Sequence, residues 1–470
     1  MSSRRVTQTA TVTIMLVLGG NLFAPVATMA EEVPWTKTYN GSGYDAAYDI
    51  VQTSDGGYAL VGVTSSTTNP ADGNCLLVKT DATGVMQWNH TYGTSDDEQV
   101  YTLIQTADGG FVLAGTQGPQ PPIIKATSQA SSSEGFWDFW LVKTDSHGIS
   151  QWNQTYGGEG YDYAWALIQT TDGGYALMGG TTSYGAGKDD AWLIKTDAAG
   201  VAQWNHTYGT NDGEQAYTLI QTVDGGFVFA GKQGSPTSSE DFWLVKTDAT
   251  GVMQWNHTYG TEDDECVYDL IQTIDGGFML AGDKRGPFTR PDLWLVKTDA
   301  TGVVQWNQTY GPTLGCFTIT IVQTSDAGYT FARTTSSPGT QQLEGWLTKI
   351  ASNGTIQWDR RYNQAYITSL ILTSDEGFAM AGMVVNQGTG ADFLLIRTTD
   401  TGVLASEFQT PETSFLLYAL WLSFLAFTGG SIGLTASKIV YARYRKWRQP
   451  TAKEHKEQEG KKTHKVNPNS

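Results

Sequence analysis

Short runs of apolar residues, many alternating with polar ones, recur along most of the chain and are separated by turn-forming residues. Residues 214–260 show the pattern clearly, with runs at 216–222, 226–232, 241–247 and 252–259. Alternation with a period of two over such short lengths is typical of β-strands. Each segment of this kind is therefore predicted to form four antiparallel strands.

The connections within this segment are short. Residues 224–226 (Asp-Gly-Gly) join the first two runs, and residues 248–251 (Asp-Ala-Thr-Gly) join the last two. Glycine adopts the positive φ that tight hairpins need, and aspartate can bond to its own backbone. Both connections are predicted to be tight turns on the same face of the sheet, which leaves the longer and more variable loops on the opposite face.

Tryptophan marks the repetition of this unit along the chain. One set lies on the predicted fourth strand, with successive separations of 53, 64, 52, 51, 51 and 52 residues: Trp35, Trp88, Trp152, Trp204, Trp255, Trp306 and Trp358. A second set lies on the predicted third strand: Trp140, Trp192, Trp243, Trp294 and Trp346. A period near 50 residues is typical of propellers and solenoids. Because both sets recur whatever their neighbours, we interpret them as core residues between adjacent sheets.

The strand count predicts how the repeats close. The first recognisable strand, at 34–40, is of the fourth type, and the last complete one, at 392–398, is of the third type. All strands pair if the N-terminal strand completes the last sheet, which leaves no broken sheet edge. The chain is therefore predicted to be an all-β protein, a seven-bladed β-propeller of four-stranded blades closed by the N-terminal strand. The alternative, an open solenoid, needs atypical capping repeats, and none is evident.

The repeat DGG(Y/F)xxAG, followed by DxWLxKTDxxG and QWNxTYG, resembles that of a family of tandem-repeat propellers in exported archaeal and bacterial surface proteins. The resemblance extends from residue 35 to about residue 407. It implies exposure at the cell surface and does not bring an established activity with it.

Both ends of the chain indicate export and membrane attachment. Arg4 and Arg5 precede an apolar stretch and small residues up to Ala30, as in a secretory signal. Residues 414–434 carry no charge, and at about 1.5 Å per residue they span a bilayer core about 30 Å thick. The basic residues that follow favour a cytoplasmic tail. The predicted organisation is a signal peptide (1–30), an extracellular propeller (31–410), a single transmembrane helix that follows it (411–437) and a basic tail (438–470).

The predicted extracellular part is strongly acidic. Residues 31–412 carry 17 Lys and Arg against 44 Asp and Glu, whereas residues 435–470 carry 10 against 3. An acidic domain of this kind repels nucleic acid, so no nucleic-acid partner is expected. It suits cations and basic partners.

The loops that connect one repeat to the next are acidic, and we expect them to ring the mouth of a central channel. Their acidic residues are Asp96, Asp97, Glu98, Asp212, Glu214, Asp263, Asp264 and Glu265, with Asp45 and residues 159–162 at equivalent places. Crowded carboxylates gain from a cation, and calcium is the candidate because it prefers oxygen ligands. Solvated turn residues without an ion are the alternative, since no cluster has the spacing of a known calcium loop.

The loops between the second and third strands vary most, and function tends to reside on such loops. They include the insertion 118–136 and a basic loop with Lys284, Arg285 and Arg290, which are candidate contact residues. The leading hypothesis is a surface recognition or adhesion module that binds an extracellular protein or glycan. A structural component of the cell envelope is the alternative, and an enzyme acting on extracellular carbohydrate is a third.

Few residues suggest catalysis. His90, His206 and His257 lie on the predicted outermost strands and His147 lies in a turn, so none is expected at the channel mouth. The sequence contains no Ser/His/Asp or zinc-ligand arrangement. We therefore expect no catalytic residues, although a pair of carboxylates could serve a glycosidase.

Several residues are candidates for modification or association. N-x-S/T sequons begin at Asn40, Asn89, Asn153, Asn205, Asn256, Asn307 and Asn353, and an exported protein can carry glycans there. Cys266 and Cys316 stand at nearly equivalent places in adjacent repeats, so a disulfide between them is possible. Gly429 and Gly433 form a GxxxG pair that can bring two membrane helices together.

Overall fold

The computed structural model describes residues 34–39, 43–65, 74–93, 97–118, 136–234, 239–286, 290–313, 319–336, 342–386 and 390–404. Within these ranges the chain forms 28 strands and no helix, so none of them holds a helix long and apolar enough to cross a membrane. The predicted signal peptide, membrane helix and basic tail lie outside the described residues.

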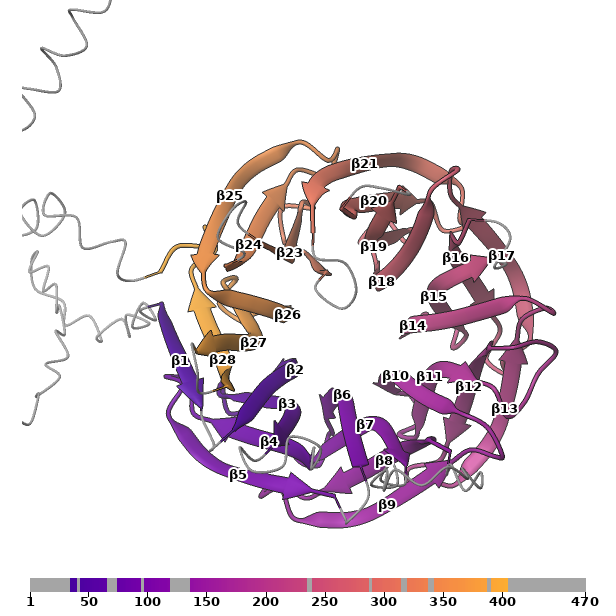
Figure 1. Ribbon diagram of the computed structural model, residues 1–470, viewed down its shortest axis with the longest axis horizontal. Coiled ribbons are helices and arrows are strands. Elements are labelled where there is room, and N and C mark those ends of the chain that lie inside the picture. Colours follow the sequence, from indigo (N-terminus) through magenta and orange to yellow (C-terminus); the bar gives the residue numbers. More distant parts are fainter. Residues whose placement is uncertain are drawn as a thin grey trace, which may run out of the picture. The chain divides into compact units, whose positions relative to one another are not determined.

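The strands form four-stranded antiparallel units around a central axis (Figure 1). Five sheets have four strands each, and one sheet has eight. That larger sheet consists of two four-stranded units, because a single residue pair, Tyr44 and Ala391, joins them. The described residues thus form seven units in a propeller-like ring, and the predicted all-β propeller class is confirmed.

Each unit uses the same four strand positions between the axis and the rim (Figure 1). The innermost strands are β2 (Tyr44–Gln52), β6 (Asp97–Gln105), β10 (Asp162–Gln169), β14 (Gly213–Gln221), β18 (Asp264–Gln272), β22 (Thr320–Gln323) and β26 (Ala365–Leu372). The second strands are β3 (Tyr58–Ser65), β7 (Phe111–Gly118), β11 (Tyr175–Thr181), β15 (Phe227–Gly234), β19 (Phe278–Arg285), β23 (Tyr329–Ser336) and β27 (Phe378–Asn386).

The outer half of each unit is equally regular. The third strands are β4 (Asn74–Thr80), β8 (Asp138–Thr144), β12 (Asp190–Thr196), β16 (Asp241–Thr247), β20 (Asp292–Thr298), β24 (Leu343–Ile350) and β28 (Gly390–Thr398). The outermost strands are β5 (Met86–Tyr92), β9 (Ser150–Tyr156), β13 (Ala202–Tyr208), β17 (Met253–Tyr259), β21 (Val304–Pro312), β25 (Ile356–Asn363) and β1 (Trp35–Tyr39).

The first strand of the chain completes the last unit. β1 runs antiparallel to β28, with Trp35 opposite Arg397 and Tyr39 opposite Phe393. The last unit therefore combines strands from both ends of the repeat region, as the strand count predicts. This pairing satisfies a sheet edge that would otherwise be open to other chains.

A tryptophan, a tyrosine and a glycine connect each unit to the next. On β13, Trp204 packs with its ring centroid 5.8 Å from that of Phe227, and the Tyr208 hydroxyl donates to the carbonyl oxygen of Gly251 at 2.5 Å. Gly251 has a φ of 83°, and a Cβ atom there would lie 2.7 Å from the Trp204 ring. A residue with a side chain would be strained at this position, because the backbone conformation favours glycine and a Cβ atom would displace the neighbouring rings.

The tyrosine-to-glycine hydrogen bond occurs at all seven junctions. Its partners are Tyr39 and Gly84, Tyr92 and Gly148, Tyr156 and Gly200, Tyr208 and Gly251, Tyr259 and Gly302, Tyr310 and Gly354, and Tyr362 and Gly402. The QWNxTYG and TDxxG motifs of the repeat are therefore the two halves of one contact between neighbouring units.

The prediction that the recurrent tryptophans are core residues is confirmed for four of the five on the third strands, whereas Trp346 is only half-buried. Trp140, Trp192, Trp243 and Trp294 on the third strands are at most 7% exposed. The tryptophans of the outermost strands are half-buried, because one side of each ring covers the turn of the next unit.

A buried lysine reaches the first turn of six units. Lys246 on β16 donates to Asp224 at 2.9 Å and to the carbonyl oxygen of Thr247 at 2.6 Å. The equivalent pairs are Lys79 with Asp55, Lys143 with Asp108, Lys195 with Asp172, Lys297 with Asp275, and Lys349 with Asp326. In the last unit Arg397 and Asp375 take their place. Hydrogen bonds from Thr222 and then from Lys246 lower the pKa of Asp224 to about 2.

Removal of one junction contact is expected to destabilise the ring. Trp204→Ala should lower the free energy of unfolding by about 3 kcal/mol, because it leaves a cavity against the next unit. Tyr208→Phe should cost about 1 kcal/mol, the net value of one hydrogen bond. Urea unfolding measures both, and Val201→Ala at an exposed position of the same unit is the control. Equal stability of Trp204→Ala and the control would contradict this account.

The lysine–aspartate pairs are expected to make the fold sensitive to acid. The pKa of Asp224 is lower in the folded chain than its ordinary value of 3.8. Its stabilising contribution is therefore complete above about pH 4 and is lost as the pH falls towards 2. Lys246→Met should flatten the loss of unfolding free energy between pH 4 and pH 2, whereas Lys188→Met at an exposed site should leave the slope unchanged. Identical slopes in the two variants would refute the role of the pair.

Candidate functional site: an aromatic cavity on the ring axis

The innermost strand of six units contains a β-bulge at the same position. In β6, Val100 pairs with Gly115 and Thr102 pairs with Ala114, so Tyr101 is an extra residue between them. The extra residues of the six bulges are Tyr48, Tyr101, Trp165, Tyr217, Tyr268 and Thr368. A bulge redirects the side chain of its extra residue, and five of these six residues are aromatic.

A glycine on the neighbouring strand permits each bulge. A Cβ atom at Gly115 would lie 1.9 Å from the carbonyl oxygen of Gln99 and 2.7 Å from the Cα atom of Val100. The same contact, at 2.0 Å or less, exists at Gly62, Gly179, Gly231, Gly282 and Gly382. The glycine that ends the DGG(Y/F)xxAG motif is therefore required by the bulge, whereas the residue before it varies, as in Val61 and Met178.

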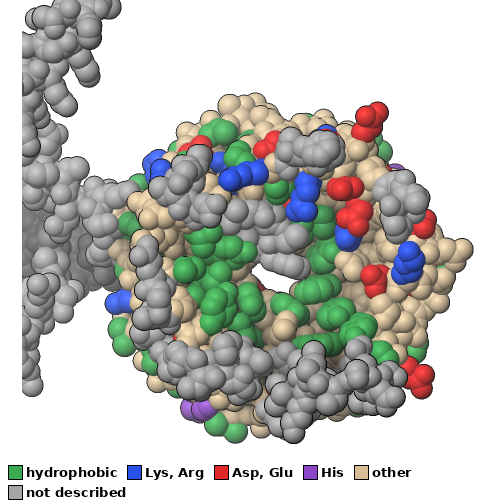
Figure 2. Space-filling view, viewed as in Figure 1, with side chains coloured by type: hydrophobic (Ala, Val, Ile, Leu, Met, Phe, Trp, Pro, Cys, Tyr) green, Lys and Arg blue, Asp and Glu red, His purple; other side chains and the backbone are tan. Residues whose placement is uncertain are grey.

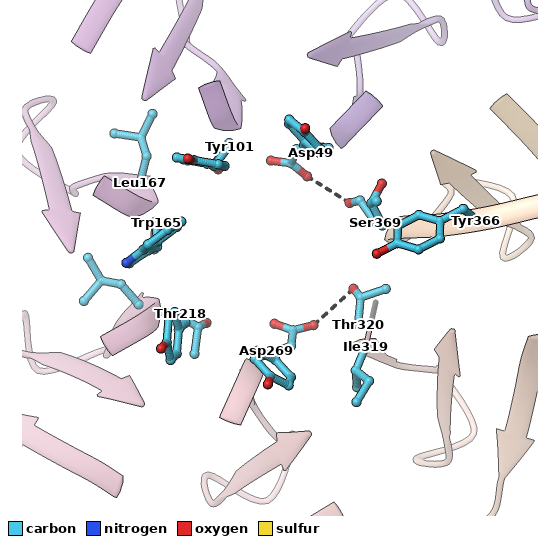
Figure 3. A pocket seen from close by; sticks show the side chains of 17 residues that line it. Asp49, Tyr101, Trp165, Leu167, Thr218, Asp269, Ile319, Thr320, Tyr366 and Ser369 are labelled. Atoms are coloured by element: carbon cyan, nitrogen blue, oxygen red, sulfur yellow. Dashed lines mark hydrogen bonds between the residues drawn. The ribbon is translucent and has the colours of Figure 1, made fainter. Parts of the chain in front are cut away.

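The aromatic residues of the bulges line a cavity of about 400 Å³ (Figure 3). All seven units contribute to its 17 lining residues, and its volume falls in the usual range of small-ligand sites. Tyr366 adds a sixth aromatic ring. The hydroxyl groups in the lining belong to Thr102, Thr218, Thr320, Thr368 and Ser369, in addition to the tyrosines. Figure 2 shows hydrophobic side chains gathered around the central opening of the ring.

The aromatic rings form a continuous belt across five consecutive units. The centroid distances are 6.1 Å from Tyr48 to Tyr101, 4.8 Å from Tyr101 to Trp165, 5.9 Å from Trp165 to Tyr217, and 5.9 Å from Tyr217 to Tyr268. Such spacings favour tilted aromatic contacts, and each side chain is only half-buried. The belt therefore presents accessible ring surface to the cavity.

Two carboxylates lie in the cavity wall, and each connects neighbouring units. Asp49 accepts hydrogen bonds from the backbone N–H groups of Ile50 at 2.8 Å and Leu103 at 3.0 Å, and from the Ser369 hydroxyl at 2.9 Å. These donors belong to three units, so Asp49 ties the end of the ring to its beginning. Burial raises the pKa of Asp49.

Asp269 plays the same part between the fifth and sixth units. It accepts hydrogen bonds from the N–H groups of Leu270 at 2.8 Å and Ile321 at 2.7 Å, and from the Thr320 hydroxyl at 3.1 Å. Burial raises its pKa to about 6. Figure 3 shows the bonds from Ser369 and Thr320 on different sides of the cavity.

The cavity contains no basic group among its described lining residues. Its charged side chains are two carboxylates, so it offers nothing to balance the charge of an anion. The lining is suited to a neutral or cationic ligand that presents both apolar surface and hydroxyl or amine groups.

The acidic residues predicted to surround the channel mouth have several different environments. Glu98, Glu214 and Glu265 are completely buried, whereas Asp212 and Asp264 are exposed. Asp263 pairs with Lys284 at 3.2 Å. Asp96 and the side chain of Asp97 lie outside the described residues.

None of the acidic loop residues that the structure describes lines the central cavity. Within the described ranges no group of three or more His, Cys, Asp or Glu side chains is placed to hold a metal ion. Calcium at the mouth of the channel stays a prediction.

The predicted basic contact residues bond to the chain itself. Lys284 contacts Asp263 and the Thr261 hydroxyl, Arg285 lies 3.6 Å from Asp283, and Arg290 donates to the Ser336 hydroxyl at 2.8 Å. Residues 119–135 of the long insertion lie outside the described ranges. The role of the insertion and of Lys284, Arg285 and Arg290 as contact residues stays a prediction.

The sequons on the outermost strands are exposed. This applies to Asn89, Asn153, Asn205, Asn256 and Asn307, while Asn353 is exposed in a turn and Asn40 lies outside the described residues. Glycosylation stays a prediction. Cys266 is buried, and because Cys316 lies outside the described ranges a bridge between them stays a prediction as well.

The aromatic cavity is the part of the candidate site that the sequence analysis missed. A signal was present, because in five repeats an aromatic residue lies two positions before the recurring Leu or Ile of the innermost strand. Simple alternation assigns that residue to the same face as the buried Leu or Ile. The bulge, which alternation cannot reveal, turns it into the cavity.

Comparisons with known proteins found distant structural similarities and no match in sequence. No family model and no curated protein matches the sequence. A solved structure of puromycin hydrolase is 11% identical with a TM-score of 0.48 and covers 77% of this chain and 54% of its own. A neuraminidase-like protein from A/bat/Guatemala/164/2009 is 9% identical with a TM-score of 0.41, and the match covers 64% of this chain and 88% of that protein. A protein of unknown function from Dyadobacter fermentans is 10% identical with a TM-score of 0.43, and the match covers 77% of this chain and 98% of that protein. At this level of similarity nothing about activity transfers to the present chain.

Asp269 is expected to contribute a pH dependence opposite to that of the turn aspartates. Its pKa is raised in the folded chain, so the folded state holds the proton more tightly than the unfolded state. The resulting stability is complete below about pH 4 and is lost as the pH rises through 6. Asp269→Asn should remove this slope, on the order of 1–2 kcal/mol between pH 4 and pH 7. Chemical unfolding at a series of pH values measures it, and an unchanged slope would show that Asp269 is ionised throughout.

Proposed function

We propose that this chain is a cell-surface recognition module that binds an uncharged carbohydrate in the aromatic cavity. The observation that carries the proposal is the belt of aromatic side chains on the bulges, surrounded by hydroxyl groups and two carboxylates. Sugars combine an apolar C–H face with a rim of hydroxyl groups. Aromatic rings pack against the apolar C–H face of a sugar, and hydroxyl and carboxylate oxygens accept hydrogen bonds from the sugar hydroxyl groups.

The charge of the site favours neutral sugars over acidic ones. The described lining residues include no Lys, Arg or His, so a sugar carboxylate or sulfate would be buried without a counter-charge from them. The acidic composition of residues 31–412 adds long-range repulsion of anions. Acidic sugars are therefore expected to bind poorly.

Surface location is part of the same proposal. The signal segment (1–30) exports the chain, the helix predicted at 411–437 holds it in the membrane, and the propeller faces outward. In this proposal the variable loops select which glycans, or glycan-bearing proteins, approach the cavity.

Binding without catalysis agrees best with the state of the two carboxylates. Asp49 and Asp269 each accept three hydrogen bonds, two of which come from neighbouring units. Carboxylates that are bonded in this way stabilise the wall of the cavity. A structural role in the cell envelope is the alternative, and it needs no ligand in the cavity.

The test is a binding experiment with the purified full chain on a panel of neutral, acidic and amino sugars. Neutral oligosaccharides should bind saturably. Trp165→Ala and Tyr101→Ala should each weaken binding about tenfold or more, as expected for aromatic hot spots. Val223→Ala, at a completely exposed turn residue, is the matched control and should bind like the natural chain.

Each outcome discriminates between the functions. Binding that survives both aromatic substitutions would place the ligand elsewhere and overturn the proposal. No binding to any sugar would favour the structural role. Hydrolysis of a bound oligosaccharide, abolished in Asp269→Asn, would make the chain an enzyme.

A further inference from the structure

Pairs of carboxylates meet at three consecutive junctions between units. Each pair joins the first residue of a third strand to the first or second residue of the next innermost strand: Asp138 with Asp162, Asp190 with Glu214, and Asp241 with Glu265. A glycine follows the intervening outermost strand in each case. These residues lie away from the aromatic cavity, so the inference below is independent of the proposed function.

The carboxylates of the middle pair face each other closely. A Cβ atom at Gly209 would lie 1.9 Å from Asp190 Oδ1 and 2.9 Å from Glu214 Oε2, which places these two oxygens no more than about 4.8 Å apart. At the preceding junction, a Cβ atom at Gly157 would lie 1.8 Å from Asp138 Oδ1 and 2.8 Å from Asp162 Oδ2. The same geometry therefore occurs twice.

The middle pair is buried, and although Glu214 accepts hydrogen bonds from Thr210 and Gln233, one oxygen of Asp190 has no partner among the described residues. Asp190 is 1% exposed and Glu214 is 0% exposed. Asp190 Oδ2 accepts from the N–H groups of Ala186 at 2.9 Å and Gly187 at 3.0 Å, but its Oδ1 atom is buried without a hydrogen-bond partner among the described residues. Two facing carboxylates in such a place cost a large free energy unless a cation or a proton lies between them.

At the third pair, the side chain of Lys284 supplies a positive charge beside the carboxylates. Lys284 stands opposite Glu265 in the strand register, where Gln233 stands opposite Glu214. The Lys284 ammonium lies 3.7 Å from Glu265 Oε1. In the described part of the chain, no lysine or arginine pairs with Asp190, Glu214, Asp138 or Asp162.

We propose that the Asp190–Glu214 junction binds a divalent cation, Ca²⁺, with Asp138–Asp162 as a second copy, and that Lys284 replaces the ion at the third junction. Ca²⁺ bonds to oxygen at about 2.3–2.6 Å, so one ion fits between oxygens separated by up to about 5 Å. Its remaining positions are available to backbone carbonyls and water. A polar hollow of about 290 Å³, lined by Thr210, Asp212, Glu214 and Gln233 among others, gives the ion a route to Glu214.

A shared proton is the competing way to relieve the repulsion. Burial, and then the neighbouring Asp162, raise the pKa of Asp138, so protonation of this carboxylate becomes more favourable as the pH falls. The two possibilities differ in their response to calcium at neutral pH. Only the cation site gives a stability that a chelator removes and Ca²⁺ restores.

The experiment is a Ca²⁺ titration of the chelator-stripped full chain by calorimetry and thermal unfolding at pH 7.5, with Mg²⁺ as the comparison ion. About two Ca²⁺ ions should bind per chain and raise the unfolding temperature by several degrees. Gln233→Lys copies the Lys284 arrangement into the middle junction. It should bind about one ion and be less dependent on calcium.

The reciprocal variant guards against folding artefacts. Lys284→Gln frees the third pair and should raise the stoichiometry to about three ions, a gain that a misfolded chain cannot mimic. An unchanged stoichiometry in both variants would overturn the assignment. So would an unfolding temperature that rises at pH 5 without calcium and does not respond to Ca²⁺ at pH 7.5, because that behaviour identifies a shared proton.

Discussion

The hydroxyl of an outermost-strand tyrosine, donated to a glycine carbonyl of the next unit, is the contact on which the rest of the structure depends. It recurs seven times, and the adjacent tryptophan covers the same turn. Each unit touches only its neighbours, so the ring is as strong as this repeated junction. The carboxylates Asp49 and Asp269 add hydrogen bonds at the axis, where the outer contacts do not reach.

The sequence was sufficient to predict the strands and the closure of the ring, because both follow from periodicity. Residues 241–247 were predicted as a strand and coincide with β16, and the N-terminal strand pairs with β28 as expected. The innermost strands begin earlier than predicted: β14 starts at Gly213, not Ala216. Its first residues are polar and interrupt the apolar pattern, but they pair with Gly234, Gln233 and Lys232 of β15.

The candidate site was harder to predict for a physical reason. The acidic loop residues were conspicuous in sequence, yet Glu98, Glu214 and Glu265 are buried between units and do not face an open channel. The aromatic residues that do line the cavity depend on a bulge, which shifts the strand register by one residue. Register is a property of paired strands, and Gly115, which pairs with Val100 beside the bulge, reveals it only when both strands are placed together.

The pairing of β1 with β28 also sets an order of events in biosynthesis. The ribosome makes β1 before every other strand of the ring and makes its partner last. Until β28 appears, the first strand has no sheet to join and the last unit cannot form. Completion of the ring is therefore possible only after the whole repeat region has been synthesised, and a chain interrupted within it keeps unpaired strand edges that invite aggregation.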